Sequence, residues 1–432
     1  MHFDSDMRAF AHDLVDRLFD HVEQIDSRPV VDWKSAPELR ALLRDTNDPI
    51  GAILEHSIQL HHPSYMGHQV CPPFPSAILG DLLISTLNQS TAVWEMSPAG
   101  TVIEQEVVRW LADRAGYPAE SLGTAVSGGS AANLTGLLAA RARWRARGGS
   151  DDPVILAGAD THYSVARAAS IMGIERVIKI ETGDAHRMSI DALARNLGPN
   201  VLAIVATSGS TATGAFDDLE KIRDLAPDTW LHVDAAHGAS VLLSDRLKHL
   251  VRGLDRADSF SWDPHKMLWM PLSLGAILVR DGQWLRRAFE ADAPYLFHAE
   301  RELDNIGAVT IQCSKRADAI KLWLTLKLFG TAPFTAALEK VTGITRYLYD
   351  CIVESGDFEA MHEPDFNIFC FRYRGTDEQN LELRERLIRS GESWITSTVL
   401  RGRRVLRVTM INPRTEREHV DAMLESLRRL AR

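Results

Sequence analysis

The most informative stretch of this 432-residue chain is Asp258-Ser-Phe-Ser-Trp-Asp-Pro-His265-Lys266. It places Lys266 beside His265, on a tight Asp-Pro turn that follows a short apolar strand. Upstream, residues 230–233 predict another strand, which ends at Asp234. An amine and a carboxylate therefore each follow a predicted strand, and the organisation of the surrounding chain decides whether the two groups meet.

Short apolar runs and helical patterns alternate on both sides of this stretch. The strand candidates are residues 124–126, 154–156, 177–180, 201–206, 230–233, 259–260 and 275–279. Strands separated by helices predict an α/β fold with a mostly parallel central sheet, covered on both faces. Ligands on such sheets bind beyond the carboxyl ends of the strands, where the polar motifs of this chain fall.

The chain changes character after Gly330. Further strands are predicted over residues 368–373, 394–399 and 405–410, and helices over residues 7–22, 76–88, 101–115, 316–329 and 416–430. We expect an N-terminal helical segment over residues 1–60, a large domain over 61–330 and a smaller α+β domain over 331–432. The apolar stripe of the first helix fits packing on its own subunit or on a partner subunit.

Composition is that of an ordinary soluble enzyme, with 45% apolar and 25% charged residues. The net charge of -10 argues against nucleic-acid binding, which usually needs a basic face. No apolar stretch reaches the roughly 20 residues that span a bilayer. The acidic N-terminus also lacks the pattern of a signal peptide. We expect a cytoplasmic protein with no nucleic-acid or membrane partner.

Neither disulfides nor a metal site is expected. The four cysteines, at positions 71, 313, 351 and 370, are scattered and form no Cys-x-x-Cys pair. This pattern is typical of a reducing compartment and gives neither a disulfide framework nor a zinc site. Sixteen histidines are present, but none has the spacing of a His-Glu-x-x-His motif.

A glycine-rich segment, Ser127-Gly-Gly-Ser130-Ala-Ala-Asn133, joins a predicted strand to a helix that runs to about residue 147. Glycines allow a tight turn and close approach to a ligand, and the helix offers unpaired N–H groups and the positive end of its dipole. The segment is therefore a candidate phosphate cradle. An ordinary strand-to-helix turn remains the alternative.

Two more strands are followed by polar residues. An imidazole at His162 is placed to stack on a flat ring, although a histidine at a strand end is often structural. The hydroxyl of Thr207 is a candidate donor to a cofactor oxygen, or the cap of a turn. With Lys266 as an amine for a Schiff base and Asp234 as a carboxylate for a protonated ring nitrogen, these groups indicate pyridoxal 5'-phosphate (PLP) as cofactor.

The motifs together resemble the group II PLP-dependent amino-acid decarboxylases, which include aromatic-amino-acid, glutamate, cysteine-sulfinate and 2,4-diaminobutyrate decarboxylases. The resemblance runs from about residue 61 to residue 421, in the order that the family shows. It rests on His-Pro-Ser-Tyr-Met-Gly-His68, Trp94-Glu-Met-Ser-Pro-Ala-Gly-Thr, Gly128-Gly-Ser-Ala-Ala-Asn-Leu and the segment from Ser259 to Lys266.

This resemblance implies a fold-type I PLP-dependent transferase architecture and assigns roles to single residues. Lys266 would be the Schiff-base lysine and Asp234 the partner of the pyridine nitrogen, with His162 stacked on the ring and His265 beside the cofactor. Tyr295 matches the loop tyrosine that returns a proton after carbon dioxide leaves. The positions that match phosphate-contacting or other cofactor-contacting residues are Gly129, Ser130, Ser259, Thr207 and Ala236.

The reaction implied is decarboxylation of an L-amino acid to its amine, through a Lys266 Schiff base and a quinonoid intermediate, in a homodimer with the active site at the subunit interface. One alternative is an aldehyde-forming oxidative deaminase, which in this family is associated with loss of the tyrosine that Tyr295 matches. Other fold-type I chemistry and a non-catalytic PLP-binding regulator are more remote alternatives. The regulator would need a further domain.

The substrate stays open at this level. Candidates for the substrate pocket are His68, Gln69 and Trp94. Arg414 is a candidate partner for a carboxylate, although an exposed structural arginine is an equal alternative. Pro72 and Pro73 resemble the corresponding residues of the diaminobutyrate decarboxylases, a similarity that favours a substrate with a small polar or cationic side chain. His237 stands where many relatives carry an aromatic residue, so we expect an altered pocket wall.

Overall fold

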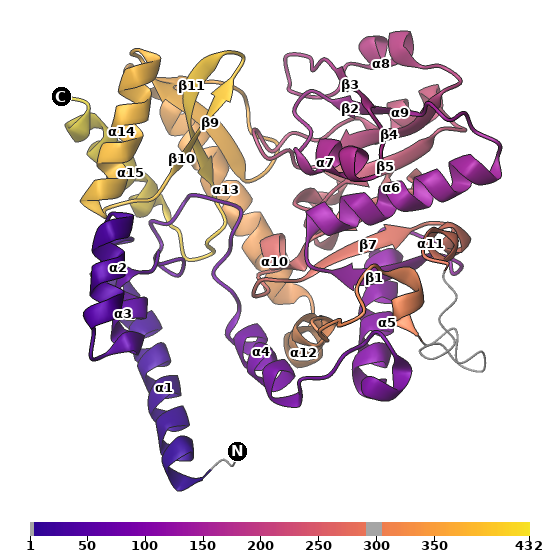
Figure 1. Ribbon diagram of the computed structural model, residues 1–432. Helices are drawn as coiled ribbons and strands as arrows, with labels where there is room; N and C mark the ends of the chain where they lie inside the picture. Colours follow the sequence, from indigo (N-terminus) through magenta and orange to yellow (C-terminus); the bar gives the residue numbers. More distant parts are fainter. Residues whose placement is uncertain (1–3, 291–304) are drawn as a thin grey trace. The chain divides into compact units, whose positions relative to one another are not determined.

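The computed structural model of the chain describes residues 4–290 and 305–432 (Figure 1). These residues form two compact units. The large unit consists of Pro73–Thr342 and His362–Ile368, and the small unit of Met1–Pro72, Gly343–Met361 and Phe369–Arg432. The three-segment division at residues 60 and 330 stays a prediction.

The large unit is built on a seven-stranded sheet with the order β1-β7-β6-β5-β4-β2-β3. Its strands are β1 (Leu122–Val126), β2 (Val154–Gly158), β3 (Arg176–Ile180), β4 (Val201–Thr207), β5 (Trp230–Asp234), β6 (Ser259–Trp262) and β7 (Gly275–Val279). β7 is antiparallel to both of its neighbours, whereas the pairs from β6 to β3 are parallel. The predicted mostly parallel sheet is thereby confirmed.

Burial explains the composition of these strands. β2, β4, β5, β6 and β7 are buried along their whole length, and continuous apolar runs are typical of strands covered on both faces. β3 is the exception, with exposed or half-buried residues up to its last position, because it lies at the edge of the sheet.

Helices cover both faces of this sheet. The helices of the large unit are α4 (Pro75–Leu87), α5 (Pro98–Arg114), α6 (Gly129–Ala146), α7 (Ser164–Ile171), α8 (Ile190–Asn196), α9 (Leu219–Leu225), α10 (Pro264–Met267), α11 (Gly282–Ala288), α12 (Ala319–Phe329) and the first part of α13 (Ala332–Glu354). α6 packs across β4, β5, β6 and β7, as Figure 1 shows. Leu137, Ile155, Val205 and Trp230 belong to the resulting core.

β1 shows that the two faces are covered by different helices. A Cβ atom on Gly123 would lie 2.9 Å from Val108 of α5, and one on Gly282 of α11 would lie 2.7 Å from the Cβ of Leu122. Because successive residues of a strand point to opposite faces, α5 and α11 lie on opposite sides of β1. The positions of these glycines allow the helices to approach the strand closely.

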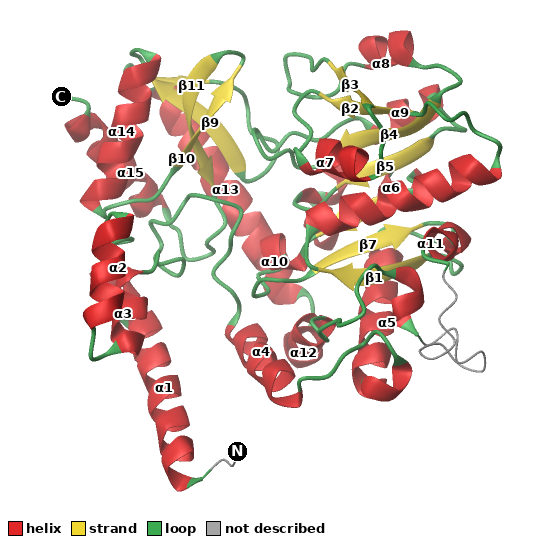
Figure 2. Cartoon of the chain, in the orientation of Figure 1, coloured by secondary structure: helices red, strands yellow, loops and turns green. Residues whose placement is uncertain are grey.

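The small unit carries a four-stranded sheet with the order β10-β11-β9-β8 (Figure 2). Its elements are α1 (Ser5–Glu23), α2 (Ala36–Asp45), α3 (Pro49–His56), β8 (Phe358–Ala360), β9 (Ile368–Tyr373), α14 (Asp377–Ser390), β10 (Thr396–Leu400), β11 (Arg403–Thr409) and α15 (Arg417–Leu430), together with the end of α13. Arg401 and Gly402 join β10 to β11 with φ angles of 48° and 78°. Two positive φ angles are typical of the tight turn that joins antiparallel strands.

The helix predicted over residues 7–22 is confirmed as α1, which begins where the carboxylate of Asp4 accepts the N–H of Met7 at 2.9 Å. Most of its large apolar side chains remain exposed, including Phe10 (49%) and Phe19 (48%), whereas Leu14, Val15 and Val22 are half-buried. The stripe is therefore only partly packed within the described chain. None of the described helices combines the length and apolar character needed to cross a membrane.

Candidate active site

One cavity of about 270 Å³ lies where β1, β2, β4, β5 and β6 reach their carboxyl ends. The structure brings a large part of the predicted site together on its wall: Gly129, Ser130, His162, Thr207, Asp234, Ala236, His265 and Lys266. These residues come from separate segments of the sequence and converge because the carboxyl ends of parallel strands share one edge of the sheet.

The glycine-rich segment forms the turn into α6. Gly128 has a φ of 149°, a backbone conformation that L-residues with a side chain rarely adopt. A Cβ atom there would lie 3.0 Å from Cε1 of His265. A Cβ atom on Gly129 would lie 2.9 Å from the Cβ of Ala236. The glycines thus keep the cavity open at the N-terminus of an 18-residue helix, which is a favourable place for a phosphate group.

Lys266 lies on the short helix α10, and its Nζ is 3.1 Å from Oδ2 of Asp263. The same oxygen accepts the backbone N–H of Gly129 at 2.9 Å, and Asp263 is almost fully buried. Asp263 therefore links the lysine to the glycine-rich turn. No role for Asp263 was predicted from the sequence, although its position three residues before Lys266 places the two side chains on one helical turn.

Asp234 ends β5, and all of its hydrogen-bond partners donate to it. Oδ2 accepts from Nδ2 of Asn133 at 2.8 Å, and Oδ1 accepts from the hydroxyl of Ser261 at 3.1 Å and from the N–H of Ala236 at 3.3 Å. The carboxylate is 7% exposed and lies on the cavity wall. It is thus oriented as an acceptor for one further donor, such as a protonated ring nitrogen.

His162 presents a flat ring to the cavity from the segment after β2. Its Nδ1 lies 2.8 Å from the hydroxyl oxygen of Ser164 and accepts the backbone N–H of the same residue at 3.3 Å. Burial lowers the pKa of His162, with the charge of Asp234 opposing that shift. A neutral imidazole held in this way can lie against the face of an aromatic cofactor.

Thr207 ends β4 and is anchored by a buried carboxylate. Its N–H donates to Oδ2 of Asp217 at 2.7 Å, and Oδ1 of Asp217 accepts the N–H of Met188 at 2.6 Å. Burial raises the pKa of Asp217 to about 6. Asp217 follows Thr207 by ten positions, and its contact with Thr207 fixes the end of the strand beside the cavity.

Comparison with known proteins decides the family. The pyridoxal-dependent decarboxylase conserved domain matches residues 27–374. An aromatic-L-amino-acid decarboxylase of Bacillus atrophaeus is 29% identical, covering 99% of this chain and 95% of its own. An L-2,4-diaminobutyrate decarboxylase of Rhizobium meliloti (strain 1021) is 33% identical, covering 88% and 80%. The solved structure of mouse CSAD superposes with a TM-score of 0.90 at 27% identity, covering 98% and 99%. The chain belongs to the pyridoxal-dependent decarboxylase family.

The predicted family, fold-type I architecture and PLP cofactor are therefore confirmed, and the chain is a PLP-dependent amino-acid decarboxylase. Its cavity fits this cofactor on chemical grounds. It offers an amine (Lys266), a buried carboxylate at a strand end (Asp234), an imidazole face (His162) and a helix N-terminus lined by glycine. These are the groups that an aldehyde, a ring nitrogen, an aromatic ring and a phosphate require.

Ser259 lies away from the cavity wall of the decarboxylase. Its hydroxyl oxygen accepts the indole N–H of Trp230 at 3.0 Å and lies 2.8 Å from Nδ1 of His232. The side chain is fully buried at the start of β6, at the opposite end of the strand from Lys266. Ser259 therefore supports the site from within the sheet, and a direct contact with phosphate stays a prediction.

The predicted substrate residues are not among those that line this cavity. The backbone N–H of Trp94 donates to Oδ1 of Asn305 at 3.0 Å. His68, Gln69 and Arg414 belong to the small unit, where Nη2 of Arg414 pairs with Oδ2 of Asp26 at 2.6 Å. The exposed structural role that the sequence left open for Arg414 is thus visible. Its role toward a substrate, like those of the other three, stays a prediction.

The loop tyrosine, Tyr295, lies outside the described residues. His237, in contrast, is placed on the cavity wall, at the position where the sequence departs from many relatives. Its Nε2 lies 2.7 Å from Oδ1 of Asn367, and its ring centroid is 5.9 Å from that of Phe366. The wall therefore carries an imidazole held by a neighbouring amide.

His232, two residues before Asp234 on β5, gives the protein a testable pH dependence. Burial lowers the pKa of His232 from 6.5 to about 4. Between these values the unfolded chain binds the proton and the folded chain does not. The contribution of His232 to stability is therefore fully present above pH 6.5 and is lost as the pH falls through 4. The free energy of unfolding can be measured by denaturant titration at several pH values. As the pH falls from 6.5 to 4, it should decrease more steeply for the wild type than for His232→Gln. An equal dependence on pH in the two proteins would contradict the lowered pKa of His232.

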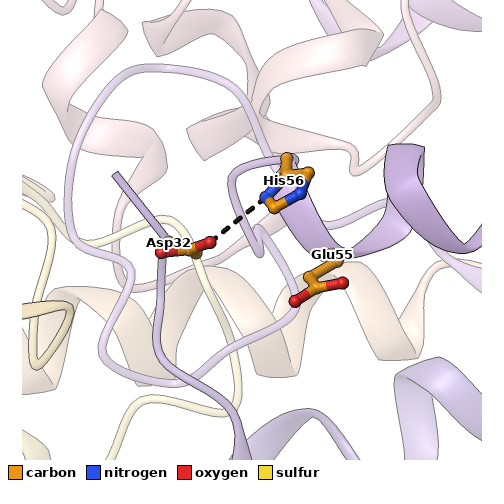
Figure 3. Close-up of side chains that lie close together, drawn as sticks. All are labelled: Asp32, Glu55 and His56. Carbon is orange, nitrogen blue, oxygen red and sulfur yellow. Dashed lines mark ion pairs between the residues drawn. The ribbon is translucent and has the colours of Figure 1, made fainter. Parts of the chain in front are cut away.

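A second cavity, of about 770 Å³, lies in the small unit among α1, α2 and α3. Next to it, among the described residues, Asp32, Glu55 and His56 each place one ligand atom within 4.8 Å of the others (Figure 3). Asp32 is already paired with Nζ of Lys34 at 2.8 Å and with Nδ1 of His56 at 3.2 Å. The ammonium of Lys34 supplies the positive charge that a metal ion would bring, so these residues indicate an ordinary ion-pair network.

Proposed function

We propose that this enzyme removes the carboxylate of an L-amino acid as carbon dioxide and releases the corresponding amine, with Lys266 as the residue that holds PLP through a Schiff base. The observation that carries the proposal is the presence of Lys266 and Asp234 on one cavity wall, beside the N-terminus of α6. Gly129 and Ser130 at that terminus are the proposed phosphate contacts, and His162 the proposed stacking partner of the ring.

The bound cofactor supplies a conjugated ring that takes up the electron pair left behind by carbon dioxide. The chain's own residues prepare that step. Asp234 would accept a hydrogen bond from the ring nitrogen, a charge-assisted contact that would contribute roughly 1.5–3 kcal/mol and keep the ring protonated. Asp263 holds the amine of Lys266 at 3.1 Å, which fixes the nitrogen at the cavity wall.

Mass spectrometry of the products tests this proposal. The purified protein would be incubated with PLP and, separately, with 2,4-diaminobutyrate, ornithine, cysteine sulfinate and aromatic amino acids. Formation of an amine by loss of carbon dioxide supports the proposal and identifies the substrate. An aldehyde or a keto acid as the main product would be consistent with PLP as the cofactor but would contradict the proposed reaction. A preparation of Lys266→Ala is the matched control for reactions of PLP in solution.

Tyr295 is the proposed proton donor to the carbon that has lost its carboxylate. Replacing it by phenylalanine removes the hydroxyl and keeps the aromatic ring. We expect Tyr295→Phe to slow amine formation by roughly 10²-fold. We also expect it to shift the product toward aldehyde, because the electron-rich carbon then waits longer for a proton and can instead give two electrons to dissolved dioxygen, after which water releases the aldehyde and ammonia. The amine-to-aldehyde ratio measures the effect, and an unchanged ratio would show that Tyr295 only packs.

We further propose a cytoplasmic homodimer with the active site at the subunit interface. Two described helices support association: α1 exposes Phe10 and Phe19, and α4 exposes Leu79 and Leu82 (48% and 57%). Apolar side chains gathered on one helix are typical of a face that another protein surface covers. The scattered cysteines fit a reducing compartment. Light scattering in solution would show whether the particle has the mass of one chain or of two.

A further inference from the structure

Asn133 joins the two side chains that the proposed function places against the cofactor ring. Its Nδ2 donates to Oδ2 of Asp234 at 2.8 Å and to the hydroxyl of Ser164 at 3.0 Å. Ser164 in turn contacts Nδ1 of His162 at 2.8 Å. On the other side, Oδ1 of Asn133 lies 3.0 Å from Nε2 of His232. Asn133 is 1% exposed, so water does not replace these partners.

The carboxylate of Asp234 fixes the direction of these hydrogen bonds. An ionised carboxylate only accepts, so the amide of Asn133 must turn its NH₂ group toward Asp234. The amide oxygen then faces His232, and because that oxygen only accepts, Nε2 of His232 must carry a hydrogen. The orientation of one amide thus determines the tautomer of a buried histidine.

The opposite end of the chain of hydrogen bonds agrees with this direction. The indole N–H of Trp230 only donates, and it donates to the hydroxyl oxygen of Ser259 at 3.0 Å. His232 is neutral near pH 7, because burial lowers its pKa to about 4, and with Nε2 protonated its Nδ1 is an acceptor. The hydroxyl of Ser259 therefore donates to Nδ1 at 2.8 Å. Each polar atom from Trp230 to Asp234 has one consistent role.

The branch through Ser164 determines the state of His162. The backbone N–H of Ser164 donates to Nδ1 of His162 at 3.3 Å, so that nitrogen is an acceptor and takes the hydroxyl hydrogen as well. A neutral His162 must then carry its hydrogen on Nε2. The hydroxyl oxygen of Ser164 keeps an acceptor position for Asn133, and the second hydrogen of the amide fills it.

We propose that Asn133 and His232 are positioning residues, which hold Asp234 as a pure acceptor for the ring nitrogen and keep His162 in its Nε2–H form. This inference rests on the proposed function of the cavity. The packing supports it: a Cβ atom on Gly136 of α6 would lie 2.6 Å from Nδ1 of His232, so the helix leaves only enough room for the imidazole. Neither Asn133 nor His232 touches the reacting atoms in this proposal, because both act through Asp234 and His162.

Two variants of His232 separate positioning from packing. Glutamine places its amide near the position of Nε2 and keeps a donor toward Asn133, whereas asparagine places its amide near Nδ1 and keeps only the contact with Ser259. We expect the affinity for PLP to stay within about threefold of the wild type in His232→Gln and to fall about tenfold in His232→Asn. Equilibrium titration with PLP measures both, at a temperature where thermal unfolding shows that both variants are folded.

Equal PLP affinities in the two variants would overturn the inference, as would a larger loss in His232→Gln. The wild type serves as the control for the proposed function. If it forms no borohydride-reducible adduct with PLP, the proposed function itself fails. If it forms the adduct and the two variants bind alike, only the positioning role fails.

A measurement on the wild type avoids the question of whether the variants fold. With ¹⁵N-labelled histidine, NMR distinguishes protonated from unprotonated ring nitrogens, and the spectra of His162→Gln and His232→Gln assign the two signals. We expect both histidines to carry the hydrogen on Nε2 at pH 7. A hydrogen on Nδ1 of His232 would contradict the direction of the hydrogen bonds from His232 through Asn133 to Asp234. A hydrogen on Nδ1 of His162 would contradict the role of Asn133 and Ser164 in setting the tautomer of His162.

Discussion

We expect Lys266→Ala to lose the visible absorbance of the Schiff base between the lysine and PLP, and to reduce amine formation by more than roughly 10³-fold. Alanine removes the amine that is proposed to form the covalent link, while the rest of the wall, with Asp234, His162 and the N-terminus of α6, is retained. The variant should therefore still bind PLP, but without covalent attachment. Absorbance spectra, borohydride reduction and product assays measure the three effects.

The matched control is Lys248→Ala. Lys248 is exposed and pairs with the neighbouring Asp245, so its removal changes the lysine count without touching the cavity. This control should keep both absorbance and activity. Peptide mapping after borohydride reduction would locate the modified lysine directly. A reducible adduct retained in Lys266→Ala would show that another lysine holds the cofactor, and the roles built around α10 would then fail.

The parts of the site that sequence predicted well are those with local signatures. Asp234 and Lys266 each follow a strand, and because the strands are parallel, their carboxyl ends meet at one edge. The glycines at the start of α6 were also predictable, because a strand-to-helix turn beside a ligand needs residues without a Cβ atom. Periodicity and turn chemistry were enough for these positions.

The hydrogen-bond partners of these residues could not be found in the same way. Asn133 and Asp234 are separated by 101 positions in the chain, and their contact depends on how far α6 is shifted along the sheet. A weaker signal existed for His232: it precedes Asp234 by two positions on one strand, so both side chains point to the same face. The alternation of side chains along the strand predicts the face of the sheet on which His232 lies, but not that Asn133 contacts it.

The pairing of distant backbone segments in the small unit could not be predicted from local sequence patterns either. The N–H of Met66 donates to the carbonyl of Trp394 at 2.9 Å, and Tyr65 bridges to Trp394. The motif around His68 was recognised, but its association with a strand region more than three hundred positions later has no local signature. Only the folded chain shows that segments near both ends of the sequence belong to one unit.

We expect Asp234→Ala to lower turnover by roughly 10²–10³-fold while the content of bound PLP falls far less. The carboxylate is proposed to keep the ring nitrogen protonated, and its loss removes the charge that draws electrons into the ring. Lys266 and the N-terminus of α6, which are proposed to hold the cofactor, are retained in this variant. Turnover per bound PLP, obtained from product assays and cofactor absorbance on one sample, is the quantity to compare.

Ser261→Ala is the matched control, because it removes one of the three donors to Asp234 and keeps the carboxylate itself. A single hydrogen bond of this kind contributes about 1 kcal/mol, so this variant should lose less than about tenfold in turnover. If the two variants lost turnover equally, the orientation of Asp234 would matter as much as its charge. If Asp234→Ala kept the turnover of the wild type, the ring nitrogen would need no carboxylate, and Asp234 would have no part in the mechanism.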